Sequence, residues 1–321
     1  MGSLLGCRSA ALSIAACMSV GRSPFLSIGN NHNDGNGDSD ERILKQREEL
    51  FQQVGNSDHA MFCAVYEKWD ALNSGGGSKK KFCQIYGLSF VTMRDVKQLV
   101  HQLDSALCSI GFVERNESNI NATSWRIIRS LVVSSLAPTH LVRVQRPSQK
   151  YTETMEGAIE KDGVAKEYKF FTRSNENDHN NKSEQQQQQF RNHYHGISEE
   201  RVFLHPSSAM FAVGTYNCPW IVYNDLVRTS KPFLRDATEC SSYSLLLFGG
   251  KLSVQIADEC IIVDDYVRLS ANARIGALIG GLRDKIDDLL TEKVQNPTVD
   301  ISSRTEMKLI IKLLLNDGLA V

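Results

Sequence analysis

The sequence lacks every short motif that marks a phosphate-binding or catalytic site. It contains no GxxxxGK[ST] phosphate loop, no GxGxxG dinucleotide loop, no GxSxG nucleophile elbow and no HExxH metal motif. The run GGGSKKK has glycines and lysines without the spacing that wraps a phosphate. Asp264 and Asp265 are adjacent in an expected strand, where neighbouring side chains point to opposite faces, so they cannot share a proton. The sequence therefore predicts no catalytic residue.

Paired cysteines and long apolar runs are also missing. No two of the eight cysteines form a CxxC pair, and no His-x-x-x-His spacing accompanies them, which argues against a zinc site. A chain of 321 residues can build its own core, so we expect reduced, mostly buried thiols and an intracellular protein. No apolar run is long enough to span a bilayer. The formal net charge is -1, so any nucleic-acid surface must be local.

Three polar stretches, residues 29–41, 73–81 and 174–196, have the composition of flexible loops. The third contains three histidines, which we interpret as solvated side chains rather than metal ligands: His179, His193 and His195.

The first 135 residues carry the apolar periodicity of amphipathic helices. We expect helices over 10–20, 40–54, 58–72, 89–111 and 120–135. Ser57 and Asp58 are suited to cap the third of these. The first 25 residues also fit a short signal peptide, because they contain an apolar stretch with small residues, or a mitochondrial presequence, because they carry Arg8 and Arg22 and no acid. The Gly21 and Pro24 that follow favour a small-residue core helix.

After Pro138 the pattern changes to short segments rich in Val, Ile, Phe and Tyr, separated by turn residues. These segments are HLVRVQR, AKEYKFFTR, RVFLHP, PWIVYNDLVRT, PFLRDATEC, SLLLFGG, KLSVQIAD and CIIVDDYVRLS. Their even spacing indicates a sandwich or small barrel. A helical period returns at Ala273 and ends at Asn296-Pro297, and a last helix is expected over 303–315. The predicted fold class is α+β: a helical domain, a β-barrel and a helical tail.

Together these blocks resemble the C-terminal region of DEAH-box RNA helicases, in particular the RNA helicase A-like group. GSLLGCRSAALSIAACMSVGRSPF, NSDHAMFCAVYEKWDA and FCQIYGLSFVTMRDVKQL are similar to parts of the helicase-associated, or ratchet, domain. RVFLHPSSAMF, PWIVYNDLVRTSKPFLRDAT and YSLLLFGG are similar to the OB-fold that follows it, and ARIGALIGGLRDKIDDLLTEKVQNP is similar to the helical extension after the OB-fold.

The resemblance implies a partial ratchet domain at 1–135, an OB-fold at 136–270 with an insertion at 174–196, and a helical extension at 271–321. Such helicases carry two RecA-like motor domains before the ratchet, with motifs that this chain lacks. ATP and Mg²⁺ are therefore expected as cofactors of the motor domains alone, and enzymatic activity only as part of a longer protein. The signal-peptide interpretation falls away, while cytoplasmic, nuclear and mitochondrial locations stay open.

In the family, the ratchet domain and OB-fold line the path of single-stranded RNA, so the resemblance implies an RNA-guiding role. The candidate RNA contacts are Thr229, Lys231, Arg228, Arg235, His205, Arg143 and Arg146. Thr229 and Lys231 are favoured because alternate residues of a strand share a face. Contacts of this kind to phosphate position RNA without reading its sequence. Lys79, Lys80 and Lys81 would add a weak, salt-sensitive attraction.

Each of these candidates has a structural alternative. Arg235 can pair with the neighbouring Asp236, His205 can close a strand turn, and Trp220 and Tyr223 fit a core better than a stacking surface. Two other functions stay open: a stand-alone, non-catalytic RNA-binding protein, and a docking module for a G-patch-type activator protein. The expected partners are single-stranded or structured RNA, the RecA-like motor domains of a complete protein and a G-patch-type activator, with no membrane.

Overall fold

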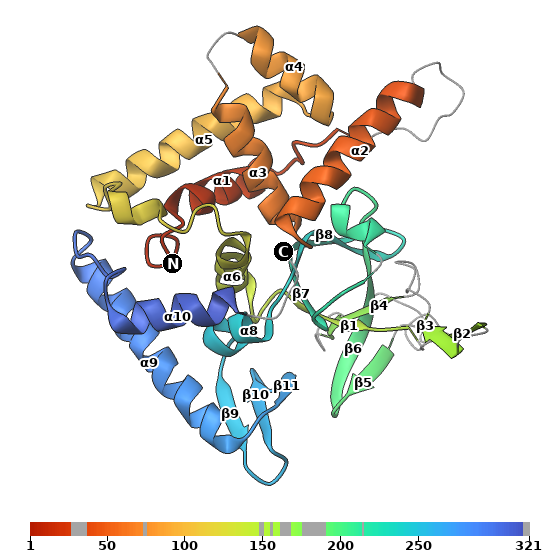
Figure 1. Cartoon of the computed structure of the whole chain (residues 1–321), viewed down its shortest axis with the longest axis vertical. Helices are drawn as coiled ribbons and strands as arrows, with labels where there is room; N and C mark the ends of the chain where they lie inside the picture. Colours follow the sequence, from red (N-terminus) through yellow and green to blue (C-terminus); the bar gives the residue numbers. More distant parts are fainter. Residues whose placement is uncertain are drawn as a thin grey trace.

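The structure, a computed structural model, has a helical part, a closed β-barrel and a C-terminal part of helices around a small sheet (Figure 1). It describes residues 1–26, 37–72, 76–147, 151–154, 157–160, 168–174, 191–213 and 215–316. The fold is α+β, as the sequence predicts. One apolar core runs across all three predicted domains and a second across the first two, and the residue limits of those domains stay a prediction.

The helical part is built around α3 (Asp58–Asp70), in which ten of 13 residues are buried. Neighbours therefore cover α3 on nearly every side, and it needs no polar face. Its N-cap is Ser57, whose hydroxyl accepts a hydrogen bond from the Ala60 amide at 3.0 Å, which confirms the predicted cap. The other elements of this part are α1 (Arg8–Ser19), α2 (Gly37–Val54), α4 (Gly76–Tyr86), α5 (Phe90–Ser109), η1 (Asn116–Asn119) and α6 (Trp125–Leu136).

The prediction of a flexible loop at 73–81 is wrong for its second half, which begins α4. Packing stabilises this helix despite its glycines: the Phe82 and Tyr86 rings stack with centroids 4.6 Å apart, and Cys83 is buried. Residues 37–41 likewise begin α2, and residues 191–194 form a strand. Residues 27–36, 73–75 and 175–190, including His179, lie outside the described residues.

The barrel is closed by β1 (Leu141–Gln145), β4 (Lys169–Arg173), β6 (Ile197–Leu204), β7 (Trp220–Arg228) and β8 (Pro232–Glu239). Its strand order is β4-β1-β7-β8-β6, and pairing between β4 and β6 completes the ring. All these pairs are antiparallel except β6 with β8, which places Phe203 opposite Phe233. Outside the ring, β5 (Arg191–Tyr194) extends β6, and β2 (Tyr151–Thr154) pairs with β3 (Gly157–Glu160).

Two predicted strands are corrected by the structure. SLLLFGG forms a helix, α8 (Ser242–Phe248), because Ser241 caps it by accepting from the Ser244 amide and its three leucines are buried. CIIVDDYVRLS is a hairpin of β10 (Cys260–Val263) and β11 (Val267–Ser270). Asp264 and Asp265 form its turn with φ of 53° and 57°, the left-handed conformation that Asp tolerates. The two carboxylates are therefore not strand residues.

The C-terminal part joins this hairpin and β9 (Leu252–Gln255) to two helices, α9 (Ala273–Gln295) and α10 (Thr305–Leu315). The order β11-β10-β9 forms a sheet of its own, and α9 packs on β9 and β10. α10 contacts α6, α8 and α9, so it connects this part to the helical part (Figure 1). Both predicted C-terminal helices are confirmed.

Six of the eight cysteines are buried, as expected. Within the described part of the chain, none of the helices has the length and apolar character that crossing a membrane requires.

Candidate nucleic-acid interface

Strand alternation places a row of basic and aromatic side chains on the outside of the barrel. On β6, Val202 and Leu204 point into the core, so Arg201 and Phe203 point outward. On β8, Leu234 points inward, and its neighbours on either side point outward. We call this surface the β6–β8 patch; its residues are Arg201, Phe203, His205, Lys231, Phe233 and Arg235.

Two phenylalanines form the centre of the β6–β8 patch. The Phe203 and Phe233 ring centroids lie 6.2 Å apart, and both residues are partly exposed. Two cations lie close to the Phe203 ring. The Arg201 guanidinium carbon lies 5.0 Å from its centroid, and the Lys231 ammonium nitrogen lies 4.9 Å from it. An aromatic pair flanked by cations offers both a stacking platform and positive charge.

His205 extends the patch at the end of β6. Its ring meets the Phe233 ring edge-on with centroids 5.8 Å apart, and its Nδ1 lies 2.6 Å from the Ser207 hydroxyl. Desolvation, with a smaller contribution from the charge of Arg235, lowers the pKa of His205. This shift favours the neutral ring, which is suited to stacking and hydrogen bonding rather than to charge.

The structure changes the argument for Thr229 and Lys231. These residues do not alternate along a strand: they lie in the turn between β7 and β8. Both the amide and the hydroxyl of Thr229 face the Lys231 carbonyl oxygen, at 3.1 and 3.5 Å. Lys231 is exposed and belongs to the patch, whereas the Thr229 hydroxyl is engaged within the turn.

Arg143 lies in a buried ion pair instead of on a free surface. Its guanidinium donates to both carboxylate oxygens of Glu199, at 2.8 and 2.5 Å, and Glu199 is fully buried. The Tyr266 hydroxyl donates to the same carboxylate at 2.7 Å. The guanidinium also lies 4.5 Å from the Tyr194 ring centroid. We therefore leave Arg143 out of the interface.

Of the other predicted arginines, one is exposed on the patch and two are engaged with other groups of the protein. Arg235 is exposed on the patch, opposite Asp225 in the β7–β8 register. Arg146 is exposed and donates to the carbonyls of Tyr216 and Asn217, and Arg228 pairs with Glu200 at 2.7 Å. These contacts make Arg146 and Arg228 weaker candidates than Arg235.

Residues 118–152 contain arginines and no acid, but these arginines do not form one surface. Arg129 is only 3% exposed, and Arg126 donates to the Leu315 carbonyl. In the separate lysine run, Lys79 pairs with Asp70 and lies 4.3 Å from the Trp69 centroid. Trp220 and Tyr223 are both buried, as predicted.

Sequence reasoning missed Arg201, Phe203 and Phe233. The alternation within RVFLHP and PFLRDAT was a readable signal, because each segment places apolar core residues between outward-facing ones. What the alternation cannot give is the parallel pairing of β6 with β8, which brings the two phenylalanines side by side.

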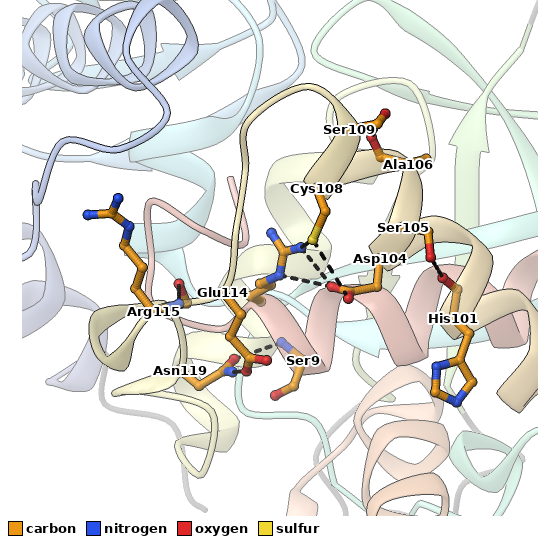
Figure 2. Close-up of polar contacts among 12 residues, drawn as sticks. Ser9, His101, Asp104, Ser105, Ala106, Cys108, Ser109, Glu114, Arg115 and Asn119 are labelled. Carbon is orange, nitrogen blue, oxygen red and sulfur yellow. Dashed lines mark hydrogen bonds and ion pairs between the residues drawn. The ribbon is translucent and has the colours of Figure 1, made fainter.

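A different surface, a groove of about 380 Å³ between α1, α3 and α5, is acidic, whereas the β6–β8 patch is basic. It is lined by the carboxylates of Glu67, Asp70, Asp104 and Glu114. Figure 2 shows Asp104 beside Cys108, and Asn119 between Glu114 and Ser9. Arg8 pairs with Asp104 at 2.7 Å, and Lys79 and Lys97 pair with Asp70 at 3.3 and 2.5 Å, so these cations offset two of the four carboxylates. Such a groove repels a phosphate backbone, so the patch is the better candidate.

No three His, Cys, Asp or Glu side chains gather as a metal site in the portion of the chain that the structure describes.

Three family profiles match the chain in succession. They are a ratchet-like helicase-associated domain at residues 1–62, an oligonucleotide/oligosaccharide-binding (OB) fold at 128–252 and a C-terminal domain of RNA helicases at 259–316. The β6–β8 patch lies within the second match.

Curated relatives agree with these profiles. The chain is 26% identical over its full length to a putative DEAH-box ATP-dependent helicase of Mycosarcoma maydis, UM11114, covering 20% of that protein. It is 28% identical, over 94% of its length, to the ATP-dependent RNA helicase DExH1 of Arabidopsis thaliana, and 28% identical, over 92%, to the DNA/RNA helicase DHX36 of Bos taurus, covering 25% of each. The chain thus spans a quarter or less of these three relatives. It belongs to the DEAH-box RNA helicase family and corresponds to the C-terminal region of those enzymes.

Proposed function

We propose that this chain is the RNA-guiding C-terminal portion of an ATP-dependent RNA helicase, and that the β6–β8 patch holds single-stranded RNA. The observation that carries the proposal is the Phe203–Phe233 pair with Arg201 and Lys231 beside it, on the outer face of an OB-type barrel. Bases stack on aromatic rings while cations follow the phosphates, and this combination binds single strands largely without reading sequence.

The chemistry of the patch favours a single strand over a duplex. Aromatic stacking needs an unpaired base face, which a duplex hides. None of the six patch residues has a carboxamide or a carboxylate, the groups that read adenine and cytosine edges, and only its two arginines have the bidentate geometry that pairs with guanine. In a complete helicase, ATP hydrolysis by motor domains would move the RNA, and this portion would keep the strand in place between steps.

The test is equilibrium binding of the 321-residue chain to a fluorescent oligouridine, followed by anisotropy over a range of salt concentrations. We expect binding that weakens steeply with salt, since each phosphate contact contributes a slope of about 0.7 in log K against log salt. A blunt duplex of the same length should bind more weakly. Absence of oligouridine binding at low salt would contradict the proposal and favour the alternative, a docking surface for an activator protein.

A further inference from the structure

The start of α3 is locked to the barrel by three consecutive side chains, Ser57, Asp58 and His59, which we call the α3 clamp. The Ser57 hydroxyl lies 2.7 Å from the Thr238 hydroxyl, and the His59 Nδ1 lies 2.8 Å from the same oxygen. Ser57 and Thr238 also form a backbone β-bridge. Thr238 belongs to β8, so the clamp attaches the helical part to a strand of the patch.

Asp58 makes the most connections within the clamp. Its Oδ2 accepts from the Ser208 hydroxyl at 2.5 Å and from the Ala237 amide at 2.9 Å, and its Oδ1 accepts from the Ala209 amide at 2.8 Å. The residue is 5% exposed. One carboxylate thus joins three separate segments: the first turn of α3, the turn after β6 and the strand β8.

Burying a carboxylate at this junction costs free energy. Its three donors are neutral, and burial raises the pKa of Asp58 to about 6. The neighbouring carboxylate of Asp236 contributes a smaller part of this rise, and the hydrogen bonds from Ser208, Ala237 and Ala209 act against it. A buried charge whose donors are neutral groups is costly, and the same contacts between apolar side chains would be cheaper. Its presence therefore points to a task that packing alone does not perform, one that requires fixed directions.

The positions of the donors show which segments Asp58 holds in place. Ser208 follows His205 by three residues, and Ala237 follows Arg235 by two residues on β8. Asp58 therefore reaches the chain just beyond each of the two segments that carry the patch. Its hydrogen bonds hold the end of β6 and the end of β8 against each other, and hold both against α3.

We infer that Asp58 is a positioning residue for the β6–β8 patch: it holds the two patch strands in one arrangement and couples that arrangement to the orientation of the helical part. This inference rests on the proposed RNA-binding role of the patch. A movement of α3 would then reach the RNA-holding surface through Asp58 and would change how tightly the strand is held. No contact between Asp58 and RNA is required.

The test compares oligouridine affinity in the 321-residue chain with Asp58→Asn, Ser208→Ala and the matched control Val65→Ala. Asp58→Asn keeps the shape but turns one acceptor into a donor that faces donors. Ser208→Ala removes one of the three hydrogen bonds and serves as the milder variant if Asp58→Asn does not fold. Val65→Ala creates a cavity in the same helix, at a fully buried position seven residues after Asp58 that makes no side-chain hydrogen bond.

We expect Asp58→Asn to weaken binding roughly fivefold and Ser208→Ala roughly twofold to threefold, in proportion to the hydrogen bonds lost. Val65→Ala should retain wild-type affinity while it is folded. Amide exchange should accelerate at Ala209 and Ala237 in the first two variants alone. The salt slope should stay unchanged in all three, because no phosphate contact is removed.

Two results separate the inference from the proposed function. If the wild-type chain does not bind oligouridine, the function of the patch is wrong and the inference falls with it. If the wild-type chain binds, and folded Asp58→Asn or, failing that, Ser208→Ala binds equally well, the inference alone is overturned. Equal losses in Val65→Ala and Asp58→Asn would also overturn it, since that pattern reflects general destabilisation.

Discussion

The barrel uses the same basic residue types in two opposite ways. The wall, as we call the barrel face that Tyr194 and Tyr266 cover, contains Arg143, which is paired with the buried Glu199 and lies against aromatic rings. On the outer face of β6 and β8, Arg235 and Lys231 are exposed, beside two partly exposed phenylalanines. The difference teaches that burial of the partner acid, rather than the number of basic residues, decides which cations are free for RNA.

The comparison also separates the free energy of unfolding from the free energy of RNA binding. A buried ion pair contributes little net stability. Removing one partner, however, destabilises the protein strongly, because the other charge stays buried without its partner. An exposed cation contributes little to stability and is available for phosphate. Substitutions in the wall should therefore change unfolding, and substitutions in the patch should change binding.

The largest effect is expected from Arg143→Met, which leaves Glu199 buried without its partner. We expect the free energy of unfolding to fall by about 3–5 kcal/mol, measured by urea denaturation. The double variant Arg143→Met/Glu199→Met should recover most of that loss. A single variant as stable as the wild type would break the distinction between wall and patch.

The next largest effect is expected in the patch. Replacing Phe203 and Phe233 together by Ala should weaken oligouridine binding by about 1–3 kcal/mol for each stacked base, with a smaller loss in stability because both rings are partly exposed. Ile256→Ala removes a large exposed apolar side chain far from the patch in sequence and serves as the control. If both variants lose the same affinity, the patch has no special role.

The pH dependence of stability sharpens the contrast between buried and exposed groups. Burial lowers the pKa of His59 to about 3, so below pH 6.5 the unfolded chain binds a proton that the folded chain does not. Between pH 7 and 5 this costs the wild type about 2 kcal/mol. His59→Gln should remove that loss. The raised pKa of Asp58 changes the free energy of unfolding in the opposite direction, but Asp58 is present in both proteins, so its contribution cancels when the two are compared.

The control for this measurement is His205→Gln, since His205 lies at the surface. It should change the difference in unfolding free energy between pH 7 and 5 far less than His59→Gln does. Equal changes in the two variants would show that burial at the α3 clamp does not set the pH dependence.

The smallest effect is expected from Arg235→Ala. Loss of one phosphate contact should reduce the slope of log K against log salt by about 0.7 and leave the unfolding midpoint unchanged. Arg274→Ala, an exposed arginine at the start of α9, should leave the slope unchanged. A slope that responds equally to both would mean that the positive charge of the patch is not specific.

Much of the fold was predictable because local signals agree with it. The Ser57 cap and the apolar periods of the helices mark their own positions, and the strand segments around the barrel alternate as strands do. The prediction failed at SLLLFGG, where a serine cap and buried leucines outweigh β propensity. It also failed at 76–81, the glycine-containing start of α4, where Lys79 contacts Trp69 and Asp70 of α3.

The site was less predictable because it depends on contacts between distant segments. Arg143 and Arg235 cannot be told apart in sequence: the partner of the first lies 56 residues away, and the exposure of the second depends on the order of the barrel strands. The parallel pairing that joins Phe203 to Phe233 has no local signal either.

The most direct test of the central claim is photocrosslinking of a 4-thiouridine oligonucleotide to the 321-residue chain, with the crosslinked peptides identified by mass spectrometry. Our account predicts crosslinks within residues 201–205 and 231–235, which are lost in the Phe203→Ala/Phe233→Ala variant. Crosslinks confined to the α1–α3–α5 groove or to α9, with none in those two segments, would contradict it.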